Sequence, residues 1–237
     1  MPLPIVWIHG FPLSSEVFEP QTRIAGWTHI RPDLPGFGDA PPPDGETSMA
    51  SYARDVLASF KAERFVLAGL SMGGYVAMEI VRQVPERVAA LLLLDTRETP
   101  DTDEGRANRY KQAEDVAKNG IGGVVEAMLP KMVVQDAFRG EVRRIMESSS
   151  PRGTIAALKA MAARPDSTET LRNATMPAFV IVGDRDEITP LRDAERMVSL
   201  LPHAEMAPIA RAAHLANYEA SEQVNNLIAA FLFRALR

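Results

Sequence analysis

Short apolar segments alternate with longer segments of helical pattern along most of the chain. Several of the short ones are continuously apolar, which is typical of strands buried on both faces of a parallel sheet. The expected strands are residues 5–8, 28–31, 65–68, 88–94, 178–182 and 205–209. This alternation predicts a doubly wound α/β fold, with a mostly parallel sheet flanked by helices.

Two apolar stripes at helical spacing predict helices that pack on this sheet. One covers residues 49–60 behind the cap candidates Thr47 and Ser48, and the other covers residues 224–231. Apolar residues at this spacing usually face a hydrophobic core, and we interpret both stripes in that way.

Residues 97–173 depart from the alternation, because they carry helical patterns and no convincing strand. Helices are expected at residues 104–118, 123–129, 136–147 and 153–163, with breaks at Gly120, Pro130, Pro151 and Pro165. The segment therefore predicts a helical cap inserted into an α/β core formed by residues 1–96 and 174–237. Because the insertion follows strand 88–94, the cap should lie at the carboxyl edge of the sheet, where open α/β sheets bind ligands.

The composition limits the classes of molecule that the protein is expected to bind. The chain has 237 residues, of which 46% are hydrophobic and 24% charged, enough for one core and one sizeable insertion. A net charge of -5 without a run of Lys or Arg argues against nucleic acid and against anionic membranes. No apolar run approaches the roughly 18 residues of a membrane helix, and no targeting pattern opens the chain, so we expect a cytoplasmic protein that binds a small molecule.

The absence of cysteine removes several kinds of chemistry. With Cys 0, disulfides, thiolate metal sites and a cysteine nucleophile are all excluded. The spacing of His and carboxylate residues gives no metal-ligand cluster either. We therefore expect no cofactor and no metal.

The pentapeptide Gly69-Leu70-Ser71-Met72-Gly73 carries the clearest chemical signal. It follows the apolar residues 65–68 and opens a helical run over residues 75–84, which is the strand, turn and helix of a nucleophile elbow. Ser71 would then stand on a strained turn, and the two glycines would let strand and helix pack closely around it. A glycine-rich phosphate loop is the alternative, but neither of its usual patterns is present here, and no Lys follows.

A serine nucleophile needs a general base, and the chain offers four histidines. His214 follows the last expected strand in a loop that leads to the final helix, which is the third place in the chain order Ser, Asp, His. His203 lies in a turn pattern and His29 at the start of an early strand, so we interpret both as structural. His9 is expected to shape the first loop rather than to transfer protons.

Three aspartates are candidates for the acid that orients His214. Asp184 and Asp186 both follow strand 178–182 on the same loop, and Asp95 follows strand 88–94. Asp186 is favoured because it lies farther from its strand and has more reach. Asp184 is interpreted as a turn former and Asp95 as a residue that orders the turn into the cap.

Two backbone groups are candidates for an oxyanion hole. The N–H of Met72 lies in the first turn of the helix after Ser71, where backbone donors have no partner. The loop His9-Gly10-Phe11-Pro12 follows the first strand, so the Phe11 N–H is expected beside it. Together they would meet the negative charge that develops in acyl transfer.

The cap contains a group of apolar side chains that could roof a pocket, with methionines that adapt to ligands of varied shape. We expect Met128, Leu129 and Met132 to contact substrate, although such residues also hold a cap to its core. Three arginines could instead clamp a substrate carboxylate: Arg97, Arg139 and Arg152. Exposed arginines of this kind usually remain solvated.

With these pieces the chain resembles the α/β-hydrolase superfamily, and more closely the small capped bacterial carboxylesterases. The matching stretches are HGFPL at 9–13, DLPGFG at 33–38, GLSMGGY at 69–75, LDTR at 94–97, RPDST at 164–168, GDRDEITP at 183–190 and HLAN at 214–217 followed by Glu219. The resemblance implies a catalytic triad of Ser71, Asp186 and His214, with Phe11 and Met72 as oxyanion donors.

The chain departs from the family pattern in three ways. Arg211-Ala212-Ala213 stands where relatives often have Gly-x-Gly before the histidine, and Ala40 replaces a common serine. The sequence also starts at the first buried strand, so we expect about six strands rather than eight. An edge of the sheet would then be protected by a loop or a second subunit, which leaves monomer and homodimer open.

The expected activity is that of a serine carboxylesterase acting on short-chain esters. Lactonases, carbon-carbon bond hydrolases and cofactor-free perhydrolases of this fold use the same three residues and remain alternatives. A serine at position 71 argues against haloalkane dehalogenases, which need a carboxylate there. A non-catalytic receptor for a small apolar ligand is the alternative outside enzymes.

Overall fold

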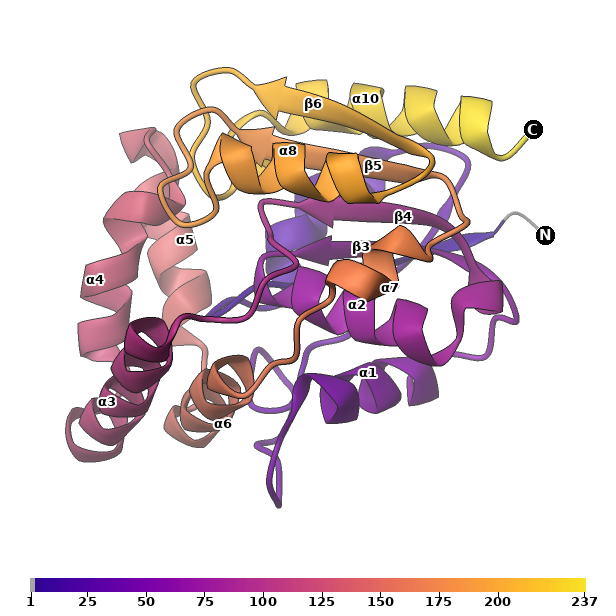
Figure 1. Ribbon diagram of the computed structural model, residues 1–237. Helices are drawn as coiled ribbons and strands as arrows, with labels where there is room; N and C mark the ends of the chain where they lie inside the picture. The colour runs from indigo at the N-terminus through magenta and orange to yellow at the C-terminus, as the bar shows by residue number, and fades with distance from the viewer. Residues whose placement is uncertain (1–2) are drawn as a thin grey trace.

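A single six-stranded sheet forms the centre of the computed structural model, which describes residues 3–237 (Figure 1). The strands are β1 (Pro4–Ile8), β2 (Thr28–Ile30), β3 (Phe65–Leu70), β4 (Val88–Leu94), β5 (Ala178–Gly183) and β6 (Ala204–Ile209). Their order is β2-β1-β3-β4-β5-β6, and every neighbouring pair is parallel. The predicted fold class is confirmed, and all six expected strands are present.

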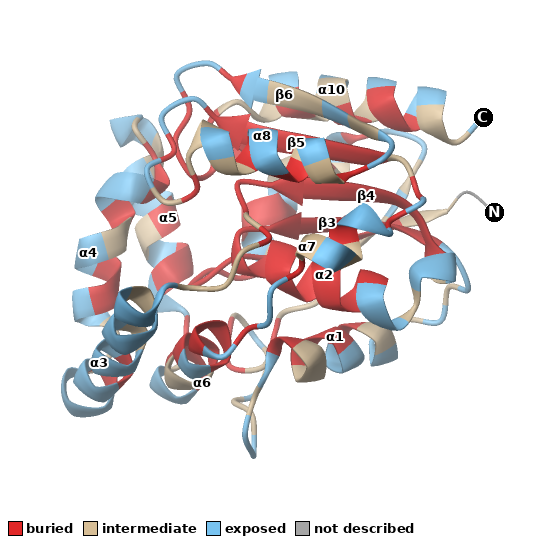
Figure 2. Ribbon diagram, in the orientation of Figure 1, coloured by how far each residue is buried: buried red, intermediate tan, exposed pale blue. Residues whose placement is uncertain are grey.

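Burial explains the strand sequences. Strands β3, β4 and β5 lie inside the sheet and are buried along their whole length, so they carry no polar side chains (Figure 2). The edge strands β2 and β6 are half-exposed, and their sequences mix polar and apolar residues. Along β1 the side chains alternate between two apolar clusters, one on each face of the sheet.

Helices cover both faces of the sheet. One face carries α1 (Met49–Ala58), α2 (Met72–Gln83) and α8 (Leu191–Leu200), and the other carries the 3-10 helix η1 (Ser15–Arg23) and α10 (Ser221–Ala235). Two short elements complete the core: η2 (Pro85–Arg87) and α9 (Ala216–Glu219). Ser48 caps α1, because its side chain accepts the Ser51 N–H.

Five helices lie between β4 and β5. They are α3 (Asp103–Asn119), α4 (Gly122–Met132), α5 (Asp136–Glu147), α6 (Pro151–Ala162) and α7 (Thr168–Arg172). Figure 1 shows α3 to α6 grouped beyond the carboxyl ends of the strands, whereas α7 packs on α2 and α8. Across residues 3–237, none of the helices is long and apolar enough to cross a membrane.

Two prolines of this segment act differently from the sequence expectation. Pro130 was expected to end a helix, and this is wrong, because it lies inside the last turn of α4. The missing N–H costs α4 one hydrogen bond there, and the helix ends soon afterwards at Met132. Pro151 is the first residue of α6 rather than a break before it, where a proline has the right φ and needs no donor.

The inserted helices meet the core at a close backbone contact. A Cβ on Gly153 of α6 would lie 2.5 Å from the Cα of Gly36, so both positions require glycine. Beside this contact the Ser150 N–H donates to the Gly36 carbonyl at 2.8 Å. The hydroxyl of Ser149 donates to the carbonyl of Pro12 at 3.1 Å. The turn between α5 and α6 is thereby held against two loops of the core.

This contact predicts opposite effects for two glycine substitutions in helices. Gly140→Ala, in α5, meets nothing within 4 Å and should raise the free energy of unfolding by about 0.5–1 kcal/mol through helix propensity. Gly153→Ala should lower it by roughly 1–3 kcal/mol, because backbone must move to admit the methyl group. Urea denaturation of both variants measures the difference, and an equally stabilised Gly153→Ala would contradict the contact.

Candidate active site

Ser71 occupies the sharp turn between β3 and α2, with Leu70 as the last strand residue and Met72 as the first helical one. Its backbone has φ 53 and ψ -115, a conformation that costs about 1–3 kcal/mol for a residue with a side chain. Two hydrogen bonds hold the turn: the Ser71 N–H donates to the Leu94 carbonyl at 2.9 Å, and the Thr96 hydroxyl donates to the Ser71 carbonyl at 2.8 Å. The turn directs the serine side chain away from the sheet.

Glycines surround this turn because backbone segments pass close to it. A Cβ on Gly69 would lie 2.4 Å from the Gly73 carbonyl oxygen, and a Cβ on Gly73 would lie 2.0 Å from that of Ile8. A Cβ on Gly10 would lie 3.1 Å from the Cβ of Ser71. The loop after β1 therefore packs directly against Ser71.

The structure brings Ser71, His214 and Asp186 together in a continuous hydrogen-bonded chain. The Ser71 hydroxyl lies 2.8 Å from Nε2 of His214, and Nδ1 of His214 lies 2.8 Å from Oδ2 of Asp186. His214 is 0% exposed and Asp186 5%, whereas Ser71 is 9% exposed. The carboxylate fixes Nδ1 as the protonated nitrogen, so Nε2 is free to accept the serine proton.

Asp186 is held as a charged acceptor. Its Oδ1 accepts the N–H groups of Ile188 (2.8 Å) and Thr189 (3.1 Å), and its Oδ2 accepts the Thr189 hydroxyl at 2.5 Å. Burial alone would raise the pKa of Asp186, but the charge of a protonated His214 and the hydrogen bonds from His214 and Thr189 keep it below its usual range. A carboxylate of this kind orients the imidazole and stabilises its charged form.

The other two aspartates have different partners. Asp184 lies in the turn after β5, and its side chain accepts the N–H of Arg211, from the segment before His214, at 2.7 Å. Asp95 has a positive φ of 43, and its Oδ1 accepts the Gly183 N–H at 2.8 Å. Burial, followed by the charge of Asp186, raises the pKa of Asp95 well above its usual value. The folded protein therefore binds a proton on Asp95 more tightly than the unfolded chain does.

Two of the remaining histidines, His9 and His29, lie in structural contacts. Nε2 of His9 accepts the Leu34 N–H at 2.9 Å, so its hydrogen is on Nδ1, which faces the carbonyl of Gly10. Burial lowers the pKa of His9 and keeps it neutral. His29 accepts the indole N–H of Trp7, and His203 is exposed.

Phe11 and Met72, the predicted oxyanion donors, lie on the two segments that flank Ser71. Phe11 follows Gly10, which touches Ser71, and Met72 follows Ser71 itself. Within residues 3–237 neither of these N–H groups has a hydrogen-bond partner. The backbone thus leaves two donors beside the serine, which suits stabilisation of a negative oxygen.

The predicted roof residues lie close to the loop that carries His214. Leu129 and Met132 are buried in the apolar cluster that contains Leu215, and Met128 is half-buried between the two clusters. The Leu215 N–H donates to the carbonyl of Met132 at 3.0 Å. Their contact with a substrate stays a prediction.

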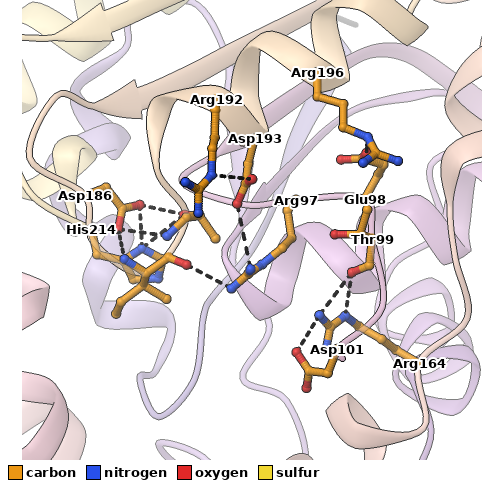
Figure 3. A network of polar contacts seen from close by, with 12 residues as sticks. Arg97, Glu98, Thr99, Asp101, Arg164, Asp186, Arg192, Asp193, Arg196 and His214 are labelled. Carbon is orange, nitrogen blue, oxygen red and sulfur yellow. Dashed lines mark hydrogen bonds and ion pairs between the residues drawn. The ribbon is translucent and has the colours of Figure 1, made fainter. Parts of the chain in front are cut away.

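Each of the three candidate arginines has a protein partner. Arg139 pairs with Asp136, and Arg152 donates to the carbonyl of Pro43. Arg97, which follows β4, donates to the carbonyl of Ile188 at 2.8 Å, beside Asp193 (Figure 3). Arg97 therefore supports the loop that carries the acid.

The sequence reasoning missed the roles of two polar residues of this region. Thr189 could have been found, because a threonine three residues after an aspartate often closes a local hydrogen-bonded turn. Glu219 accepts three backbone N–H groups, and two of them, from Val134 and Gln135, lie in a distant segment that no local pattern predicts. Among residues 3–237, no three His, Cys, Asp or Glu side chains gather as metal ligands.

Comparisons with known proteins agree with the fold. A family model described as "Alpha/beta hydrolase family" matches residues 5–227. A solved structure of a thermophilic esterase from Thermogutta terrifontis, with malate bound, is 34% identical with a TM-score of 0.93, covering 99% of this chain and 91% of that one.

Two curated proteins with hydrolase names are also similar to this chain. The AB hydrolase superfamily protein YisY of Bacillus subtilis is 29% identical over 96% of this chain and 91% of its own. A 2-hydroxy-6-oxononadienedioate/2-hydroxy-6-oxononatrienedioate hydrolase from a Pseudomonas species is 26% identical over 89% and 78%.

The strain at position 71 predicts a gain in stability when the side chain is removed. Ser71→Gly should be more stable than Ser71→Ala by about 1 kcal/mol, because only glycine adopts this backbone conformation without cost. The free energy of unfolding in urea measures the pair, and alanine serves as the control for the lost hydroxyl. An Ala variant at least as stable as the Gly variant would show that the turn is unstrained.

Asp95 predicts a dependence of stability on pH. Its pKa is raised in the folded state, so its contribution is complete below the unfolded value of about 3.9 and is lost as pH rises toward the folded value. Asp95→Asn removes this loss. The unfolding free energy of the variant should therefore rise relative to that of the natural protein as the pH increases above about 4, by at most about 1.4 kcal/mol per pH unit. Parallel pH profiles would contradict a raised pKa of Asp95.

Proposed function

The chain belongs to the alpha/beta hydrolase family, and we propose that within it the protein is a serine carboxylesterase of short-chain carboxylic esters. The observation that carries this proposal is the continuous chain from the Ser71 hydroxyl through His214 to Asp186, with 2.8 Å at each step. The 34% identity to a bacterial esterase over nearly the whole chain supports an ester as the substrate.

In the first half of the reaction Ser71 attacks the ester carbonyl. Nε2 of His214 takes the hydroxyl proton as the Oγ–carbon bond forms, and the imidazolium then gives that proton to the leaving alcohol. Asp186 stabilises the positive imidazole, and its four hydrogen bonds keep it in place while the charge appears. The product of this half is an acyl group on Ser71.

Water completes the reaction. His214 removes a proton from a water molecule that attacks the acyl carbon, and then returns the proton to Ser71 as the acid departs. In both halves the carbonyl oxygen becomes negative, and the N–H groups of Phe11 and Met72 are the proposed donors to it. Because both are backbone groups of packed segments, they need no reorganisation during the reaction.

The proposed substrate site lies between the triad and the inserted helices. Residues 97–173 serve as the cap in this proposal, with Met128, Leu129 and Met132 on the side that faces the acyl group. Two close contacts between the cap and the core, at Gly36 and at Pro12, support a roof held close to the serine. A close roof favours short acyl groups over long ones.

A panel of p-nitrophenyl esters tests the activity and its dependence on the serine. The natural protein should release p-nitrophenol rapidly from acetate and butyrate, and Ser71→Ala should lower kcat/KM by about 10³-fold or more. Ser199→Ala, at an exposed serine of α8, is the matched control and should retain full activity.

Three outcomes would contradict the proposal. Equal activity of the natural protein and Ser71→Ala would remove the serine from the chemistry and favour a ligand-binding protein. A rate that rises steadily to octanoate and palmitate would reject the preference for short acyl chains. Turnover of lactones in place of these esters would move the protein to another activity of the same triad.

A further inference from the structure

The carboxylate of Glu219 joins two segments that belong to different parts of the molecule. Its Oε2 accepts the N–H of Ala213, the residue before His214, at 2.7 Å. Its Oε1 accepts the N–H groups of Val134 and Gln135, each at 2.8 Å, in the link between α4 and α5. Glu219 is 8% exposed, so these three donors replace water around a buried acceptor.

The segment that carries His214 is fixed through its backbone at successive positions. The Arg211 N–H donates to Asp184, and the Ala212 carbonyl accepts the Arg185 N–H at 2.9 Å. These two contacts hold the segment to the loop after β5. Ala213 depends instead on Glu219, which is the last anchor before the imidazole.

The same segment is tied to the inserted helices. The Leu215 N–H donates to the Met132 carbonyl at the end of α4, on the other side of His214. Glu219 and Met132 together bind the residues before and after His214 to the four-residue stretch 132–135. The position of His214 therefore depends on the position of the α4–α5 link.

We propose that Glu219 is a positioning residue that fixes the backbone before His214 and couples the imidazole to the α4–α5 link, an inference that rests on the proposed role of His214 as base. The Nε2 to Oγ distance of 2.8 Å leaves little room for a displaced ring. A shift of the Ala213 peptide moves the attached Cα of His214 and misdirects proton transfer.

Only a carboxylate meets this set of donors. Its two oxygens face three N–H groups, and an amide has one oxygen and an NH₂ group that cannot accept. In Glu219→Gln the side-chain NH₂ group must face either the Ala213 N–H or the N–H groups of the α4–α5 link. A buried backbone N–H is then left unpaired. Aspartate keeps both oxygens but is one methylene shorter.

The test compares Glu219→Gln with Glu222→Gln, an exposed carboxylate at the start of α10. Turnover of p-nitrophenyl butyrate gives kcat and KM, and a fluorophosphonate probe gives the rate and stoichiometry of Ser71 labelling. Expressing rates per labelled site corrects for any unfolded fraction. Hydrogen exchange at the Ala213 amide reports directly on the anchor.

Glu219→Gln should lower kcat and the labelling rate together by about tenfold or more, with KM within about twofold. Exchange at Ala213 should accelerate, and Glu222→Gln should match the natural protein in every measurement. Glu219→Asp should give rates between those of Glu219→Gln and the natural protein. It replaces Glu219→Gln in the test if the glutamine variant does not fold.

Accelerated exchange at Ala213 with an unchanged labelling rate, in either variant, would overturn the proposal. A fall in labelled sites without a fall in the rate per site would also overturn it, because Glu219 would then serve stability alone. If the natural protein does not hydrolyse the ester but its Ser71 is labelled, the proposed substrate class fails while the positioning role is still measured by labelling and exchange.

Discussion

The close packing of backbone around Ser71 is the constraint on which the site depends. The end of β3 lies between β1 and β4. The loop after β1 touches the turn through Gly10, and the last residue of β4 contacts it through the Leu94 carbonyl. A parallel sheet places the ends of all its strands at one edge, so a serine on the central strand is reached by groups from both halves of the sheet. The strained turn is tolerated because its neighbours leave no alternative path.

The charged side chains near that turn are few and almost fully buried. Asp186 is kept ionised by local donors and by His214, whereas burial raises the pKa of the nearby Asp95. Two carboxyl groups in one buried region thus have pKa values shifted in opposite directions, and only the pKa of the one beside the imidazole is lowered. The Arg97 guanidinium supports the acid loop from the end of β4 without contacting the acid itself (Figure 3).

Much of this could be derived from local sequence, and the failures have a physical reason. Strand β4 and helix α5 have the predicted limits, because continuous burial and a clear amphipathic stripe are local signals. The end of α4 was missed because a proline in the last turn costs only one hydrogen bond. The anchor at Glu219 was missed because its donors at Val134 and Gln135 lie 85 and 84 residues away in the chain. Contacts of this kind follow from tertiary packing alone.

The central claim is that Ser71 is the nucleophile that His214 activates. The most direct measurement is peptide mass mapping after reaction with a fluorophosphonate, for the natural protein and for His214→Ala at equal concentration. The account predicts one phosphonyl group per chain, located on Ser71, and a rate that falls by orders of magnitude in the variant. Modification of another residue, or equal labelling of Ser71 without His214, would contradict it.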